Sequence, residues 1–557
     1  MTEIVGDATT YAVLATHTDT AAWMAEIRES VLVDPAGESP VGAAAERRPL
    51  VLDRTGRLYL RRAFESQTRL AEAVLARAGR ADFEVDWSLA EAGIERLAPD
   101  ADDDPAPRRA LSAGLARPLS IVTGGPGTGK TTLIVRLIAL LIEQARTAGR
   151  AAPRIRLLAP TGKAAAAMSA SFARQRTVLE VAPEVSEALP KAAETIHRAL
   201  HWQTRRDALG RARDFALDED VVVVDEASMV DLDLMARLFA ASESVGRVIL
   251  LGDPGQLASV DAGAVLAELC RGRSGEPGSE AVAFPDFPLR AGRVDAPIGL
   301  ADSIVTLHRS HRFGAEGGIG RLAEAIVRGD ADAAIALLDD PRHPEIERVG
   351  IDSVEGVRGR LVESNRTMQR QIAAASSPAE KLERMGSVRV LCAHRKGPLG
   401  VEALCAVLDE VAASERRTTV RAGEWPGRMV LVTRNAPDQR LWNGDVGLVD
   451  ETRAGPRAFF PDPESADGVR ALPLARLPAH ESAIAMSVHK SQGSEFERVE
   501  LVLGDVASRL MTRELLYTGV TRARGGLRIH ASEDVLREAI ARRVERDSGL
   551  SDLLWAD

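Results

Sequence analysis

The sequence is poor in cysteine, in aromatic residues and in long hydrophobic stretches. Its 557 residues include three cysteines, which lie far apart at Cys270, Cys392 and Cys405. Widely separated cysteines are typical of reduced thiols rather than of a disulfide framework or a metal site. No apolar run approaches the ~20 residues of a membrane-spanning helix, and residues 1–11 have neither the basic segment nor the apolar core of a signal peptide. We therefore expect a cytoplasmic protein with no membrane partner.

An excess of positive charge is also missing. The net charge is −10, with 71 basic and 81 acidic side chains. A protein coated by nucleic acid is usually basic, so this balance argues against that class, although it does not exclude one basic groove. Hydrophobic residues make up 45% of the chain, which is enough for sizeable cores, and the length predicts about two to four domains.

The clearest motif is G-G-P-G-T-G-K-T at residues 124–131. It follows a short apolar strand pattern at 119–123 and precedes a helical pattern at 132–144, which is the context of a phosphate-binding loop. The glycines let the backbone turn so that its amides face phosphate oxygens, and the helix N-terminus adds a positive dipole. We expect Lys130 to reach the β and γ phosphates and the Thr131 hydroxyl to bind Mg²⁺. The predicted ATP-binding residues of this segment are Gly124, Gly125, Pro126, Gly127, Thr128, Gly129, Lys130, Thr131 and Thr132.

Beyond this loop the chain alternates strand and helix patterns. Residues 154–159, 221–224 and 247–251 have the pattern of strands, and the second consists of four valines, as in a strand buried on both faces. Alternation of this kind predicts a parallel sheet covered by helices. Functional side chains are then expected where strands end and helices begin.

A second α/β unit is predicted from residue 388, with further strands at 499–503 and 527–530. Inside it, residues 428–477 break into short strand-like segments separated by turns, which favours a small inserted β-barrel. The first 100 residues have helical patterns and one hairpin pattern but no catalytic cluster, so we interpret them as a docking domain. The predicted domains are 1–105, 106–330 and 331–557, with the barrel at about 425–478.

Two acidic residues and a glutamine follow predicted strands of the first unit. Asp225 and Glu226 close the valine strand, where Asp225 would hold Mg²⁺ and Glu226 would deprotonate the attacking water. Gln256, in G-D-P-G-Q-L, carries an amide that can contact the γ phosphate. Arg312 and Arg522 are candidate arginine fingers, which would stabilise the charge of the transferring phosphoryl group.

The motifs occur in the order found in superfamily-one helicases. Their amino-acid sequences resemble those of the RecD family, the alpha subunits of RecBCD enzymes (exonuclease V). The resemblance covers about residues 119–532. After the phosphate-binding loop, the segments that carry it are A-P-T-G-K-A-A (159–165), T-I-H-R (195–198), D-E-A-S-M-V (225–230), G-D-P-G-Q-L (252–257), S-H-R-F (310–313), V-H-K-S-Q-G-S-E-F (488–496) and L-Y-T-G-V-T-R-A (516–523).

The resemblance implies an α/β fold with two RecA-like motor domains, a small helical amino-terminal domain and an SH3-like β-barrel inserted in the second motor domain. It implies ATP in the cleft between the motors, with Lys130, Glu226, Gln256, Arg312 and Arg522 as catalytic residues. It also implies a hydrogen bond from Glu495 to the nucleotide sugar. Many relatives carry a glutamine upstream of the loop that reads the adenine, but residues 108–117 contain none, which leaves strict ATP preference in question.

By their positions in the family's motifs, a further set of residues is expected on the DNA track. Stacking of bases on flat side chains and contacts to phosphates hold single strands in such motors. A simple core position remains the alternative for His197 and Trp442. The predicted DNA-binding residues are Thr161, Lys163, His197, Trp442, Asn443 and His489.

The resulting hypothesis is an ATP- and Mg²⁺-dependent 5′–3′ DNA helicase subunit of a RecBCD-type helicase–nuclease in double-strand break repair and recombination. Its partners would be single- and double-stranded DNA and RecB-like and RecC-like subunits, and a partner would supply the nuclease. Two alternatives remain: a stand-alone superfamily-one helicase acting on DNA or RNA, and a nucleotide-dependent assembly subunit without motor activity.

Overall fold

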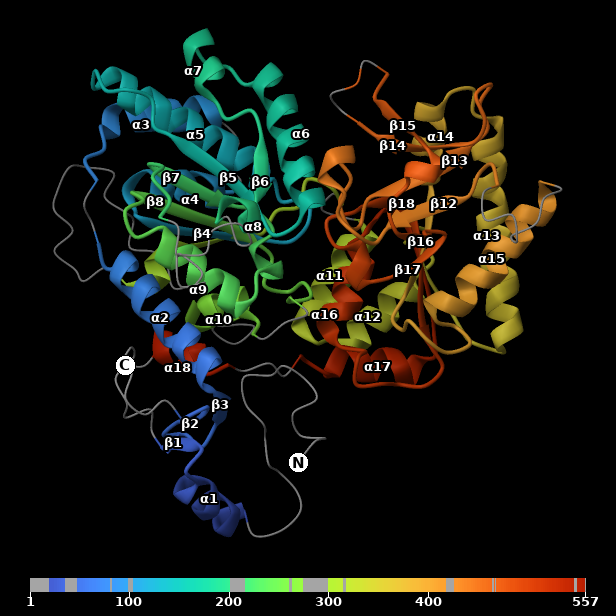
Figure 1. The fold of residues 1–557 in the computed structure, drawn as a ribbon, viewed down its shortest axis with the longest axis horizontal. Helices are drawn as coiled ribbons and strands as arrows, with labels where there is room; N and C mark the ends of the chain where they lie inside the picture. The colour runs from blue at the N-terminus through green and yellow to red at the C-terminus, as the bar shows by residue number, and fades with distance from the viewer. Residues whose placement is uncertain are drawn as a thin grey trace.

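Two α/β lobes lie side by side, and a smaller N-terminal part projects beneath the first (Figure 1). The computed structural model describes residues 20–35, 48–80, 83–98, 104–200, 216–259, 263–273, 299–313, 317–416, 425–462, 465, 467–544 and 548–555. Among the helices in these ranges, none has both the length and the apolar character that crossing a bilayer requires.

The first lobe is built on a parallel six-stranded sheet with the order β6-β5-β7-β8-β4-β9. Because β7, β8 and β4 are neighbours, the segments that follow them meet at one edge of the sheet. The strands are β4 (Leu119–Gly124), β5 (Ile155–Ala159), β6 (Ala193–Thr195), β7 (Val221–Val224), β8 (Arg247–Gly252) and β9 (Ile304–Leu307). β4 and β7 are buried along their whole length, as expected for central strands.

Helices cover both faces of this sheet and form two separate apolar cores. One core packs α3 (Trp87–Leu97), α4 (Ala106–Ala116), α5 (Lys130–Thr147), α6 (Gly162–Val178) and α7 (Pro183–Ala188) on one face. The other packs α2 (Arg61–Ala78), α8 (Ile196–Ala199), α9 (Leu232–Ala241) and α10 (Val265–Cys270) on the opposite face. The predicted α/β class with parallel sheets is confirmed.

The second lobe contains a parallel five-stranded sheet with the order β10-β19-β18-β11-β17. Its strands are β10 (Ile346–Val349), β11 (Val388–Cys392), β17 (Ala485–Ser487), β18 (Phe496–Gly504) and β19 (Ala523–Ala531). Its helices are α11 (Gly318–Arg328), α12 (Ala331–Leu338), α13 (Val354–Ala374), α14 (Pro378–Met385), α15 (Val401–Glu415), α16 (Arg513–Val520) and α17 (Glu533–Ala541).

An antiparallel five-stranded sheet is inserted between α15 and β17. Its order is β15-β14-β13-β12-β16, from β12 (Met429–Val432), β13 (Val446–Asp450), β14 (Arg457–Pro461), β15 (Val469–Pro473) and β16 (His480–Ser482). The sequence patterns anticipate β12, β13 and β15 but not β14. Whether the insertion closes as an SH3-like barrel stays a prediction.

The last described helix lies against the N-terminal part of the chain, beneath the first lobe (Figure 1). The N-terminal part contains α1 (Thr20–Glu29), β1 (Val33–Pro35), β2 (Leu50–Leu52) and β3 (Leu58–Leu60). The last helix, α18 (Leu550–Trp555), follows the second lobe in the chain but packs on α2 and α10. Asp552 pairs with Arg57 at 2.5 Å, and the Ser548 hydroxyl donates to the buried Glu268 carboxylate at 2.6 Å.

Candidate nucleotide-binding site

A cavity of about 320 Å³ lies between the two lobes, and both contribute to its walls. The first lobe supplies the loop before α5 and the segments after β7 and β8. The second supplies the segments around β18 and after α16. Of the residues predicted for nucleotide binding and catalysis, those that line it are Pro126, Gly127, Thr128, Gly129, Lys130, Thr131, Thr132, Asp225, Glu226, Gln256, Arg312, Glu495 and Arg522.

The loop has the tight backbone that its glycines permit. Gly127 and Gly129 adopt φ values of +78° and +83°, which favour glycine. A Cβ at Gly127 would lie 2.5 Å from the Arg312 Cβ, so a larger residue there would displace the arginine. Gly124 and Gly125 do not line the cavity, but their carbonyls accept from the Lys130 ammonium at 2.6 and 3.0 Å. The lysine is thereby held beside the loop amides.

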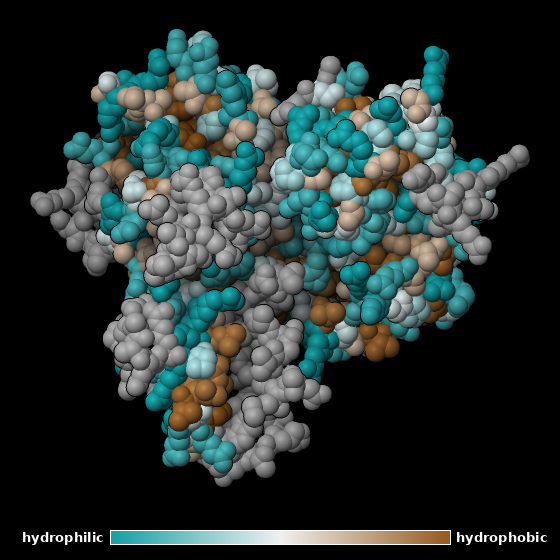
Figure 2. Space-filling model, in the orientation of Figure 1, coloured by the Kyte–Doolittle hydropathy of each residue, from teal (hydrophilic) through white to brown (hydrophobic). Residues whose placement is uncertain are grey.

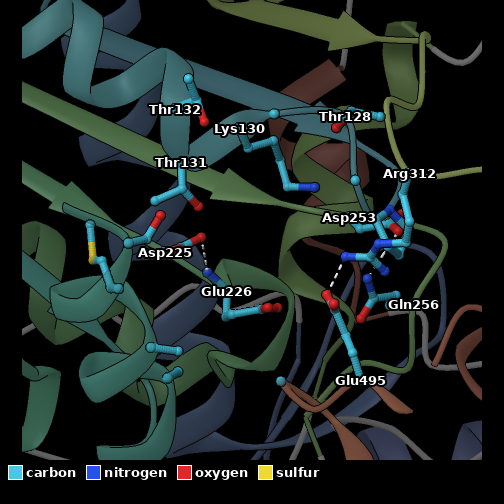
Figure 3. A pocket seen from close by; sticks show the side chains of 18 of the residues that line it. Thr128, Lys130, Thr131, Thr132, Asp225, Glu226, Asp253, Gln256, Arg312 and Glu495 are labelled. Atoms are coloured by element: carbon cyan, nitrogen blue, oxygen red, sulfur yellow. Dashed lines mark hydrogen bonds and ion pairs between the residues drawn. The ribbon is translucent and has the colours of Figure 1, made fainter. Parts of the chain in front are cut away.

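The two acidic residues after β7 point into the cavity on the side of Thr131 (Figure 3). Burial, together with the adjacent Glu226 carboxylate, raises the pKa of Asp225 to about 6. The Asp225 carboxylate accepts the Glu226 backbone N–H at 2.9 Å. Glu226 has a φ of +52°, a strained value for a residue with a side chain. Such strain is common at functional sites, and here it accompanies the turn that directly follows the strand.

Arg522 crosses from the second lobe to the glutamine of the first. It is 4% exposed, and its Nη2 donates to the Gln256 Oε1 at 3.1 Å. Its Nη1 donates to the Ser494 carbonyl at 3.2 Å and its Nε to the Thr518 carbonyl at 3.1 Å. The amide of Gln256 is fixed from its other end, because its Nε2 donates to Asp253 at 3.1 Å.

Arg312 and Glu495 form an ion pair at the same cavity (Figure 3). Arg524 contacts the second carboxylate oxygen of Glu495 at 2.8 Å. Burial by itself raises the pKa of Glu495, but Arg312 and Arg524 outweigh it and the net pKa is lowered. Glu495 is therefore charged and engaged by two arginines, so a nucleotide sugar would have to share it with Arg312.

The sequence analysis missed Asp253 and Tyr517. The Tyr517 hydroxyl donates to Asp253 at 2.9 Å, which links α16 of the second lobe to the segment after β8. Burial and the neighbouring Asp253 raise the pKa of Tyr517, so its hydroxyl stays a donor. Both residues lie inside the quoted motifs, G-D-P-G-Q-L and L-Y-T-G-V-T-R-A, which was the available signal.

Two residues predicted to bind DNA meet at the contact between the first lobe and the inserted sheet. The Trp442 indole packs on Gly162, where a Cβ would lie 2.4 Å from its Cγ. Lys163, next in α6, donates its ammonium to the Ser494 hydroxyl. Burial lowers the pKa of Lys163 to about 8, with Arg389 and Arg522 adding to the effect and Asp445 opposing it.

The other four residues of that set lie on separate segments. The Thr161 hydroxyl caps α6 by accepting the Ala164 N–H at 3.1 Å. His197 is exposed on α8, and His489 is half-buried in the short helix His489–Ser491 after β17. Asn443 is exposed beside Trp442. None of the six predicted DNA-binding residues lines the cavity between the lobes.

Comparison with known proteins gives one family match in each of the two lobes. Residues 107–262 match the AAA domain family and residues 482–530 match the UvrD-like helicase C-terminal domain family. The chain is 40% identical to the RecBCD enzyme subunit RecD of Mycolicibacterium smegmatis, over 80% of this chain and 74% of that protein. It is 38% identical to the subunit of the same name from Mycobacterium tuberculosis, over 96% of this chain and 84% of that protein. The chain belongs to the RecD family. The resemblance seen in the motifs is thus confirmed.

Two further proteins resemble the chain at lower sequence identity. The ATP-dependent RecD2 DNA helicase of Deinococcus radiodurans is 28% identical over 79% of this chain and 50% of its own length. A solved structure of the Pif1 helicase from Bacteroides aligns over 74% of this chain and 88% of its own with 17% identity and a TM-score of 0.38. That likeness is too weak to inform the site.

Proposed function

We propose that the protein is the ATP-driven DNA helicase subunit of a RecBCD-type helicase–nuclease, which moves 5′ to 3′ along single-stranded DNA in double-strand break repair and recombination. The observation that carries this proposal is the cavity between the lobes. Lys130 and the acidic pair enter it from the first lobe, and Arg522 and Glu495 enter it from the second. Such an arrangement lets one nucleotide bridge two domains that move relative to each other.

The residues divide the chemistry of phosphoryl transfer among them. Lys130 balances the charge of the β and γ phosphates, Glu226 takes the proton of the attacking water, and Gln256 orients that water. Arg522 and Arg312 stabilise the charge of the transition state. Oxygen ligands such as Asp225 and Thr131 fit Mg²⁺, and in the described part of the chain no cluster of three or more His, Cys, Asp or Glu side chains could hold a metal alone. A bound Mg²⁺ would supply charge neutralisation between the phosphates and the Asp225 carboxylate.

The nucleotide cycle drives movement through the two lobes. Bound ATP draws them together and hydrolysis releases them. DNA is held on the first lobe by Thr161, Lys163 and His197 and on the second by His489, with Trp442 and Asn443 from the inserted sheet. Alternation of the two grips produces steps along the strand. The proposed domains are 1–105, 106–330 and 331–557. Across these bounds, α11 packs in the core of the second lobe and α18 packs on the first.

The N-terminal projection supports docking to RecB-like and RecC-like partners. Hydrophobic side chains gather on it (Figure 2), and Val31, Leu32 and Leu60 are 81%, 54% and 50% exposed. Clustered apolar residues at a surface are typical of interaction sites. The relatives that match most of this chain are named as RecBCD subunits, and the nuclease would belong to a partner.

A polarity-controlled unwinding assay tests the motor. The purified chain should unwind a duplex with a 5′ single-stranded tail and not one with a 3′ tail. Lys130→Gln should abolish ATP hydrolysis and unwinding while its circular dichroism stays that of the wild type. The matched control is Lys191→Gln, because Lys191 is exposed and outside the cavity. Wild-type turnover in Lys130→Gln would contradict the proposal.

Purification from cells distinguishes the subunit from a stand-alone helicase. A RecBCD-type subunit should co-purify with two large chains in fixed proportion. An active helicase that never forms such a complex would favour the stand-alone alternative.

A further inference from the structure

Ser494 contacts both a residue proposed to bind DNA, Lys163, and a residue of the nucleotide-binding cavity, Arg522. Its hydroxyl accepts from the Lys163 ammonium, and its backbone carbonyl accepts from Arg522 Nη1 at 3.2 Å. Gly493 and Glu495 line the cavity, but Ser494 does not. The cavity therefore assigns Ser494 no direct role in nucleotide binding or catalysis.

The contacts on the Lys163 side are tightly packed. The Trp442 side chain packs on Gly162, and a Cβ added at Gly444 would lie 3.9 Å from the Lys163 Cδ. The backbone N–H of Trp442 donates to the Asp445 carboxylate at 2.8 Å, which fixes the turn before β13. This packing holds the Lys163 side chain in the seam between the first lobe and the inserted sheet, with its ammonium on Ser494.

The contacts on the other side lead directly to the cavity. Arg522 is bonded at the same time to Ser494, to Thr518 and to Gln256. The next residue, Glu495, holds Arg312. A displacement of residue 494 would therefore move Arg522 and Arg312, the two arginines that line the cavity.

We propose that Ser494 is a positioning residue that couples DNA binding to ATP hydrolysis, through one contact to Lys163 and one to Arg522. This inference rests on the proposed function. A DNA phosphate close to Lys163 competes with the Ser494 hydroxyl for the ammonium, because a phosphate oxygen is the stronger acceptor. Loss of that contact frees residue 494, and Arg522 can leave its carbonyl for the nucleotide.

The test measures ATP turnover by the full chain with and without single-stranded oligo-dT. In Ser494→Ala the ratio of the two turnover numbers should fall by about fivefold or more, the factor that corresponds to one hydrogen bond. The KM for ATP should change little, because the hydroxyl contacts Lys163 rather than nucleotide. The oligo-dT affinity should rise, because the Ser494 hydroxyl no longer competes with DNA for the Lys163 ammonium. Ser494→Thr, which keeps a hydroxyl, should restore the ratio. Ser414→Ala, an exposed position on α15, is the matched control.

A double variant separates coupling from general damage. Lys163→Met should lower the same ratio, and adding Ser494→Ala to it should lower the ratio no further. Full stimulation in Ser494→Ala, or additive losses in the double variant, would overturn the inference. If the wild-type chain itself shows no DNA-stimulated hydrolysis, the proposed function fails instead.

Discussion

At the scale of single residues, burial changes the charge of a side chain that lies beside the nucleotide-binding site. Lys163 is such a residue, because its burial between the lobes disfavours the ammonium form. The burial-lowered pKa of about 8 compares with an ordinary value of 10.5. Near neutral pH the side chain is still charged, but it loses its proton far earlier than an exposed lysine.

Binding of single-stranded DNA should therefore take up a proton above pH 8. A nearby phosphate favours the ammonium, so bound DNA raises the lowered pKa of Lys163, and affinity falls as the pH rises from about 8. Fluorescence anisotropy with oligo-dT, from neutral pH to about 9, measures this slope. Lys163→Met should flatten the slope, whereas Lys191→Met, at an exposed position, should keep it. Identical slopes in the wild type and Lys163→Met would remove Lys163 from the DNA track.

The sequence predicted most of the cavity at this scale because local motifs encode it. Lys130, Asp225 and Gln256 each follow a recognisable strand, and neighbouring parallel strands bring those ends together. Asp253 and Tyr517 were missed, since an acid or a tyrosine inside a motif has no pattern that reveals its partner. Their 2.9 Å hydrogen bond joins residues 264 positions apart.

At the scale of secondary-structure elements, β18 and β19 are joined by a buried charge as well as by their backbones. The fully buried Glu500 accepts from His530 Nε2 and Ser364 Oγ at 2.8 Å and from Arg528 Nη1 at 3.2 Å. Burial by itself raises the pKa of Glu500, but these partners outweigh it and the net pKa is lowered. A carboxylate with several partners inside a lobe is costly to neutralise.

Replacement Glu500→Gln should destabilise the second lobe by about 3 kcal/mol, because it leaves the partners of a buried charge unsatisfied. Since the folded pKa is lowered, the stabilisation by Glu500 is present above its ordinary pKa of 4.5 and is lost as the pH falls below that value. Denaturant unfolding, monitored by hydrogen exchange in β18 and β19 at neutral and at acidic pH, measures both the loss of stability and its dependence on pH. Glu497→Gln, exposed on the same strand, is the control. A Glu500→Gln protein with wild-type stability and acid sensitivity would contradict this assignment.

Elements were predicted where their own residues alternate or run apolar, as in β7 and β12. β14 was missed because its few apolar residues stand between Pro456 and Pro461, and what stabilises it is pairing with β13 and β15. Pairing of that kind depends on distant residues and leaves little local trace.

At the scale of the whole molecule, the two lobes are joined by hydrogen bonds around the cavity. The Leu257 N–H donates to the Thr518 hydroxyl at 2.9 Å, and the Gln492 amide donates to the Leu257 carbonyl at 2.8 Å. The return of α18 to the first lobe was not foreseen, because its docking on Glu268 and Arg57 is long-range. These contacts hold the two lobes together beside the cavity that Arg522 lines.

The central claim is that one arginine from the second lobe serves a nucleotide held by the first. DNA-stimulated ATP hydrolysis by Arg522→Ala tests it most directly, with ATP affinity measured in parallel and Arg370→Ala, exposed on α13, as the control. We predict a loss of turnover on the order of 10³-fold with nucleotide binding retained. Wild-type turnover in Arg522→Ala would contradict the account.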